Sequence, residues 1–294
     1  MSNFKFAGTG VAVITPFKSD KSIDYTQLEN HINYLINNKV EYLVVLGTTS
    51  EASTMSDSEK LELVQFFIAK NNKRVPLVIG MAGNDTNKIV NKIKNYNFEG
   101  LDAILSVSPY YNKPQQEGIY QHYKAIAEAS PVPVILYNVP GRTSSNINAD
   151  TTIRLANDYK NIIAIKEASG DLMQAMKIIK NKPADFEVLS GDDGLALPMI
   201  AAGAKGVISV VANTLPKHFS DLIRFALQND FAKANEIQYK LYNMFHLIFE
   251  EGNPAGVKAA MAYQNLLNEN LRLPLTPISE NLRNKIIAEM KKIG

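Results

Sequence analysis

The sequence predicts an α/β protein, specifically a TIM (β/α)8 barrel followed by a helical extension, and three observations lead to this prediction. Eight short apolar runs rich in valine, isoleucine and leucine recur along the chain, as expected of strands buried on both faces of a parallel sheet. Helix-forming segments alternate with these runs, which indicates βαβ units. After residue 215 the helical patterns continue alone. Eight consecutive units fit a barrel better than a doubly wound sheet, which usually has fewer strands.

The predicted elements follow one another in a regular order. The strands are expected to begin near Gly10, Tyr42, Pro76, Leu101, Pro133, Ile162, Phe186 and Gly206. Capping residues indicate helix starts at Asp24, Ser56, Asp85, Asn148 or Asp150, and Asp171. Further helices are expected over 115–128, 215–228, 231–249, 255–268 and 279–292. We therefore expect a barrel over residues 1–228 and a C-terminal helical extension over residues 229–294 that packs on it.

The composition excludes several classes of function. The 294 residues carry 31 basic and 29 acidic side chains, a net charge of +2, so no footprint for nucleic acid or for a membrane surface is present. The chain has no cysteine, which excludes disulfides and thiolate nucleophiles, and its four histidines lack metal-ligand spacing, so we expect no metal. No signal-peptide pattern begins the chain, and no apolar run approaches the roughly 20 residues of a membrane span. These features predict a cytoplasmic protein.

The first candidate for chemistry is Lys166, which ends the apolar run 162–165. Removing an ammonium from water is costly, so a lysine at the end of a buried strand tends toward the neutral amine. That form attacks carbonyl compounds and makes Schiff bases. The alternative interpretation is a lysine that extends to water or pairs with Glu167. Taken alone, the segment around Lys166 favours the interpretation as a lysine that reaches water or pairs with Glu167. The residues at the other strand ends are therefore needed to choose between the two interpretations.

In a TIM barrel the active-site residues lie where the strands end, and polar residues gather at those positions here. The loop 47–51 is either an ordinary turn or an anion cradle whose glycine, hydroxyls and amides bind a carboxylate. Tyr110 and Tyr111 are either packing aromatics or site residues. Arg142 is either a surface guanidinium or a carboxylate-recognising residue. Because all these positions share one end of the barrel, the functional interpretations support one another.

The turn 190–193 has two interpretations as well. Asp192 and Asp193 could hold a divalent metal between their carboxylates. A tight turn in which an aspartate caps the next helix accounts for the same residues more simply. We therefore expect a capping role.

Together the strand ends resemble a known family. The segments concerned are 47–51 (GTTSE), 108–112 (SPYYN), 137–143 (YNVPGRT), 165–170 (IKEASG) and 190–193 (SGDD). In this order, and over the whole chain, they resemble the dihydrodipicolinate synthase (4-hydroxy-tetrahydrodipicolinate synthase) family of the N-acetylneuraminate lyase/class I aldolase superfamily. The resemblance implies a Schiff-base lyase that condenses pyruvate with L-aspartate 4-semialdehyde, the first committed step of diaminopimelate and lysine biosynthesis. It implies neither a metal nor an organic cofactor.

The resemblance also implies which residues bind and activate pyruvate. Lys166 would form the Schiff base with the ketone. Thr48 and Thr49 would hold the carboxylate, and backbone groups of Gly191 and Ile208 would complete the pocket.

Proton transfer and the second substrate involve a further set of residues in this family. Tyr137 would act as general acid and base beside the imine. Thr49 would pass protons from Tyr137 to Tyr111 of a neighbouring subunit, and Arg142 would bind the carboxylate of the second substrate. A shared site requires at least a dimer, and the family is commonly a homotetramer, a dimer of dimers.

The sequence departs from the family pattern at the positions that bind the inhibitor lysine in lysine-sensitive members. Asn84 and Tyr110 are retained, as vestiges of that site. The other positions hold Asp57, Lys60 and Lys88. Two cations there would repel a cationic amino acid, so we expect weak inhibition by lysine or none.

Two other functions remain open at this point. N-acetylneuraminate lyase and keto-deoxy-sugar-acid aldolases share the barrel, the lysine and the tyrosine, but the Thr48–Thr49 pair and the run 141–143 favour the synthase. A small-molecule sensor could also keep the barrel without catalysis. The intact combination of Lys166, Tyr137 and Thr49 argues against a sensor.

Overall fold

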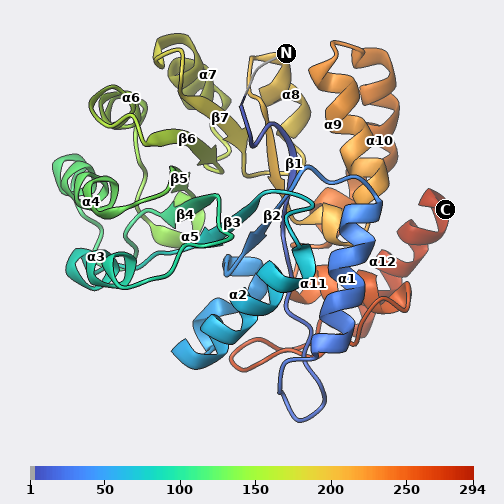
Figure 1. Ribbon diagram of the computed structural model, residues 1–294. Helices are drawn as coiled ribbons and strands as arrows, with labels where there is room; N and C mark the ends of the chain where they lie inside the picture. Colours follow the sequence, from blue (N-terminus) through green and yellow to red (C-terminus); the bar gives the residue numbers. More distant parts are fainter. Residues whose placement is uncertain (1–3) are drawn as a thin grey trace.

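Within residues 4–294, which the computed structural model describes, eight parallel strands close into a barrel in sequence order. The strands are β1 (Gly8–Ala12), β2 (Tyr42–Val45), β3 (Leu77–Gly80), β4 (Ala103–Val107), β5 (Val134–Asn138), β6 (Ile162–Glu167), β7 (Glu187–Ser190) and β8 (Gly206–Ser209). Figure 1 shows them at the centre of the molecule with helices arranged around them. The predicted TIM barrel is therefore confirmed.

Helices connect the strands, and most of the predicted helix starts are confirmed. The helices are α1 (Tyr25–Asn37), α2 (Asp57–Asn71), α3 (Thr86–Lys94), α4 (Gln116–Ala129), α5 (Pro140–Thr143), α6 (Ala149–Asp158), α7 (Leu172–Asn181), α8 (Ala196–Ala201) and α9 (Pro216–Leu227). Side chains accept hydrogen bonds from the first turn at Asp24, Ser56, Asp85, Asn148 and Asp171. Short 3-10 turns follow β2 (η1, Thr48–Ser50, and η2, Ala52–Thr54) and β8 (η3, Val211–Asn213).

The alternation of side chains along β6 directs Lys166 into the barrel. Ala164 belongs to the apolar cluster inside the barrel, whereas Ile165 belongs to the cluster between strands and helices. Because successive residues of a strand point to opposite faces, Lys166 faces the interior and Glu167 faces the helices. The parallel register sets Tyr137 of β5 directly beside Lys166. The two side chains therefore meet at the carboxyl end of the barrel.

Three helices follow the barrel, and α10 packs along α9. They are α10 (Phe231–Leu247), α11 (Ala255–Tyr263) and α12 (Glu280–Ile293), drawn in orange to red in Figure 1. The predicted length of the helix over 255–268 was wrong. Asn265 adopts a left-handed φ of 58°, and the N–H groups of Asn265 and Leu266 donate to the carbonyls of Ala262 and Met261, so a Schellman motif ends α11.

The division into a barrel over residues 1–228 and an extension over 229–294 stays a prediction. None of the helices within residues 4–294 is long and apolar enough to cross a membrane.

Candidate active site

The carboxyl ends of the strands open into a cavity of about 610 Å³. Most of the residues that the sequence singled out line it: Thr48, Thr49, Tyr110, Tyr137, Arg142, Lys166 and Gly191. Three others lie outside the lining. Ile208 is buried among the apolar side chains of the barrel interior, Tyr111 is 89% exposed, and Asn84 donates a hydrogen bond to the carbonyl of Tyr110.

Lys166 and Tyr137 line the cavity side by side. Both are buried, with exposed fractions of 5% and 9%, and the Lys166 Nζ lies 4.2 Å from the centroid of the Tyr137 ring. The ammonium makes no hydrogen bond or ion pair with any residue from 4 to 294. Glu167 instead accepts hydrogen bonds from Asn138 and from the Ser169 backbone. The alternative of a lysine that reaches water or pairs with Glu167 is therefore wrong.

Gly191 leaves the space through which the Lys166 side chain passes. A Cβ at Gly191 would lie 2.6 Å from the Cβ of Ala168 and 3.0 Å from the Cε of Lys166. These distances are below normal van der Waals contact, so a side chain at this position would force Ala168 to move and would press on the stem of the lysine. The absence of a side chain is thus required by the lysine that passes beside it.

The aspartates of the turn after β7 are occupied by backbone groups. Asp192 accepts hydrogen bonds from the N–H groups of Gly194 and Leu195, before α8 begins, and Asp193 accepts from Val210 and Val211 after β8. The expected side-chain cap of α8 is therefore wrong, because its N-cap residue is Leu195. Burial raises the pKa of Asp193 to about 6, although its hydrogen bonds act in the opposite direction. Within the described part of the chain, no three or more acidic or histidine side chains are grouped to hold a metal.

The loop that follows β2 is held in place from the C-terminal part of the chain. Glu51 is fully buried with the Nζ of Lys258 2.5 Å from its carboxylate, and both side chains have no exposed surface. The same carboxylate accepts a hydrogen bond from the Arg272 backbone N–H. Nearer the cavity, the Asn253 side chain donates to the Thr49 hydroxyl at 3.0 Å. Residues distant in sequence therefore fix the candidate anion cradle.

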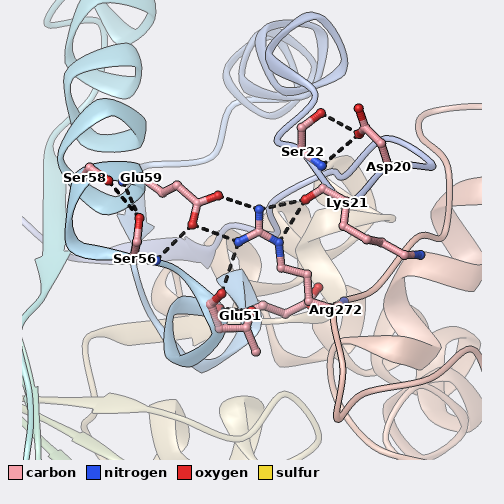
Figure 2. A network of polar contacts seen from close by, with 9 residues as sticks. Asp20, Lys21, Ser22, Glu51, Ser56, Ser58, Glu59 and Arg272 are labelled. Atoms are coloured by element: carbon pink, nitrogen blue, oxygen red, sulfur yellow. Dashed lines mark hydrogen bonds and ion pairs between the residues drawn. The ribbon is translucent and has the colours of Figure 1, made fainter.

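Arg272 links this loop to α2, as Figure 2 shows. Its guanidinium binds Glu59 through two hydrogen bonds, of 3.0 and 2.6 Å, and also donates to the carbonyls of Lys21 and Thr54. Glu59 at the same time completes the capping box with Ser56. Hydrogen bonds from the arginine lower the pKa of Glu59 from 4.5 to about 2.

This lowered pKa predicts how acid affects stability. Between pH 4.5 and pH 2 the unfolded chain binds more protons at Glu59 than the native chain. The contribution of Glu59 to the free energy of unfolding is therefore complete above pH 4.5 and is lost as the pH falls toward 2. Solvent screens this partly exposed pair, so we expect about 1 kcal/mol or less. Glu59→Gln should reduce the loss of urea stability over this pH range, and exposed Glu128→Gln should not. An unchanged pH dependence in Glu59→Gln would contradict the assignment.

Part of the cavity wall comes from the C-terminal extension, and no motif in the sequence indicated it. Phe245, Phe249 and Asn253 line the cavity, and Lys258 and Arg272 support it. One signal was available: Lys258 is the only charged residue in the apolar helix α11. A lysine in such a helix needs a buried partner, although its position alone does not reveal which one.

A closed parallel barrel with a buried lysine beside a tyrosine, in a cavity at the carboxyl ends of the strands, is typical of Schiff-base-forming lyases of the class I aldolase type. A model of the dihydrodipicolinate synthetase family matches residues 5–293. The chain belongs to this family.

Individual relatives agree over nearly the whole chain. A curated 4-hydroxy-tetrahydrodipicolinate synthase from Flavobacterium psychrophilum is 54% identical over 289 residues, which are 98% of this chain and 99% of the relative. The crystal structure of dihydrodipicolinate synthase from Aquifex aeolicus has a TM-score of 0.94 at 40% identity and covers 98% of both chains. The chloride-inhibited enzyme from Acinetobacter baumannii, complexed with pyruvate, has a TM-score of 0.95 at 40% identity, covering 98% of this chain and 99% of the other.

Proposed function

We propose that this chain condenses pyruvate with L-aspartate 4-semialdehyde to form 4-hydroxy-tetrahydrodipicolinate, the first committed step of diaminopimelate and lysine biosynthesis, in the cytoplasm. The observation that carries the proposal is the buried amine of Lys166, which has no hydrogen-bonding partner among residues 4–294 and lies 4.2 Å from the Tyr137 ring centroid in a cavity that also contains Thr48, Thr49 and Arg142. Membership of the family supports the same reaction.

The reaction begins with covalent capture of pyruvate. The neutral amine of Lys166 attacks the ketone carbon, a C–N bond forms, and the carbonyl oxygen leaves as water after taking up two protons. Tyr137, whose ring lies beside the Lys166 amine, is the general acid of this step. The pyruvate carboxylate lies against the hydroxyls of Thr48 and Thr49 and the backbone at Gly191. Ile208 can contribute only backbone groups, because its buried side chain is a hydrocarbon without polar atoms.

The second half of the reaction forms a carbon–carbon bond. Loss of a proton from the pyruvate methyl group converts the imine to an enamine, which attacks the aldehyde carbon, and the aldehyde oxygen takes up a proton. The amino group of the product then adds to the imine carbon and releases the lysine. Arg142 is exposed on the cavity wall, where a guanidinium can bind the carboxylate of the incoming substrate through two hydrogen bonds.

Two assays test the proposal together. Borohydride reduction in the presence of pyruvate should attach the substrate to the protein, and coupled product formation should require L-aspartate 4-semialdehyde. Cleavage of N-acetylneuraminate or of a keto-deoxy-sugar acid at a higher rate would instead support the sister aldolases. Adduct formation without turnover of any aldehyde would support a sensor.

We propose further that Tyr111 completes the site of a neighbouring subunit in a homotetramer. Its backbone has a φ of 72°, its side chain is 89% exposed, and it does not line the cavity of its own chain. A bulky residue held in the left-handed region is strained, and such strain gathers at functional sites.

Replacing Tyr111 with Phe is expected to lower turnover about 10²-fold, since a proton carrier is lost. Imine formation with pyruvate should persist because Lys166 and Tyr137 remain. Tyr239→Phe, on the exposed face of α10, is the matched control and should leave both unchanged. A monomer with full activity, measured by sedimentation at assay concentration, would contradict the shared site.

We also propose that lysine inhibits this enzyme weakly or not at all. Lys60 and Lys92 both line the cavity, with Asp57 3.8 Å from each. Lys88, which the sequence suggested as the second cation, is instead 86% exposed outside the lining. Two ammonium groups repel a cationic ligand, so activity should be unchanged in sub-millimolar L-lysine. Inhibition at that concentration would contradict this prediction, and it would assign a regulatory role to Asn84 and Tyr110.

A further inference from the structure

The side chain of Asn253 contacts the candidate proton pathway directly. Asn253 lies between α10 and α11, is 7% exposed and lines the cavity. Its Nδ2 donates to the Oγ1 of Thr49 at 3.0 Å, across 204 residues of sequence. Its Oδ1 is buried without a hydrogen-bonding partner among the described residues. The hydrogen bond to Thr49 is therefore the only one that the Asn253 side chain makes among the described residues.

The direction of this hydrogen bond determines what the threonine can donate. A hydroxyl has one proton and two acceptor lone pairs. The amide proton of Asn253 occupies one lone pair of Thr49, and the threonine makes no other side-chain hydrogen bond within residues 4–294. The hydroxyl proton is thus left for a group in the cavity. An amide does not gain or lose a proton near neutral pH, so Asn253 cannot itself belong to a relay.

Both ends of this contact are anchored by one ion pair. Glu51 follows Thr49 by two residues, and Lys258 follows Asn253 by five, and their side chains are buried against each other. The turn that carries Asn253 is also tightly packed, because a Cβ at Gly256 would lie 2.3 Å from the carbonyl oxygen of Ile248. The amide is therefore held toward the threonine by rigid surroundings.

We propose that Asn253 is a positioning residue that directs the Thr49 hydroxyl proton toward the reacting groups. This inference rests on the proposed function, in which Thr49 carries protons to and from the imine. In this way a residue of the C-terminal extension determines the direction in which Thr49 donates its proton, whereas the other residues of the proton pathway come from the barrel.

Asn253→Asp tests the direction of the bond with little change of shape. An ionised carboxylate can only accept, so the Thr49 proton would turn toward residue 253 and away from the cavity. We expect the turnover number to fall at least about tenfold, which is less than the roughly 10²-fold expected when a proton carrier is removed outright, while borohydride trapping of pyruvate persists. Lowering the pH protonates the carboxyl, which can then donate again, so the ratio of Asn253→Asp to Asn253→Ala turnover should rise as the pH falls.

A second comparison keeps the test valid if the aspartate variant folds poorly. In a Thr49→Val background there is no hydroxyl to direct, so Asn253→Ala should change turnover less than about twofold, whereas in the parent it should lower it clearly. Equal losses in both backgrounds, a parent-like turnover of Asn253→Asp, or a pH-independent ratio would overturn the inference. Failure of the unmodified protein to form a pyruvate adduct would refute the proposed function instead.

Discussion

Replacing Lys166 with Gln is expected to abolish covalent capture of pyruvate and to lower turnover by at least about 10³-fold, because an amide nitrogen cannot form the imine. The fold should survive. Glutamine introduces no charge at this buried position, and the lysine it replaces has no hydrogen bond or ion pair to any described residue that the change would break. The mass of the protein after reduction with borohydride in the presence of pyruvate measures the adduct, and thermal unfolding checks the fold.

Two other lysines provide matched controls for this prediction. Lys60 and Lys92 line the same cavity, but each is partly exposed and lies 3.8 Å from Asp57. Lys60→Gln and Lys92→Gln should therefore both form the adduct. An adduct that persists in Lys166→Gln, or that is lost in either control, would assign the nucleophile to another lysine.

The features that the sequence predicted well are those that depend on local pattern. Strands such as β6 are marked by apolar runs, and the capping box of Ser56 and Glu59 is marked by spacing within one turn. Because the parallel strands of a barrel all end on the same face, the positions of Thr49, Tyr137 and Lys166 at strand ends were enough to predict that they lie close together. No contact between distant segments had to be known.

The features that the sequence could not predict depend on such distant contacts. Asn253 bonds to Thr49 across 204 residues, and Arg272 reaches Glu59 across 213 residues. The sequence around Asn253 and the sequence around Arg272 contain no local pattern from which the partner residue could be predicted. The end of α11 was missed for a different reason: helical periodicity continues past Tyr263, but Asn265 adopts a left-handed conformation that terminates the helix.

The buried pair of Lys258 and Glu51 predicts the largest effect on stability. Burial lowers the pKa of Lys258 to about 8, since desolvation outweighs the attraction of Glu51. Lys258→Met would leave the carboxylate of Glu51 buried without its counter-ion, which typically costs about 3–5 kcal/mol. Urea unfolding at pH 7 measures the loss. Lys217→Met breaks an exposed pair with Asp221 on α9 and should cost about 1 kcal/mol or less.

The double variant distinguishes a lost partner from lost packing. With Glu51→Gln added, no unpaired charge remains, and the amide oxygen can still accept from the Arg272 backbone, so much of the stability should return. The pair also anchors Thr49 and Asn253, so Lys258→Met should raise the KM for pyruvate in the fraction that stays folded. A stability loss as small as that of Lys217→Met would show that the pair is not desolvated, and an unchanged KM would show that the threonine loop keeps its shape without it.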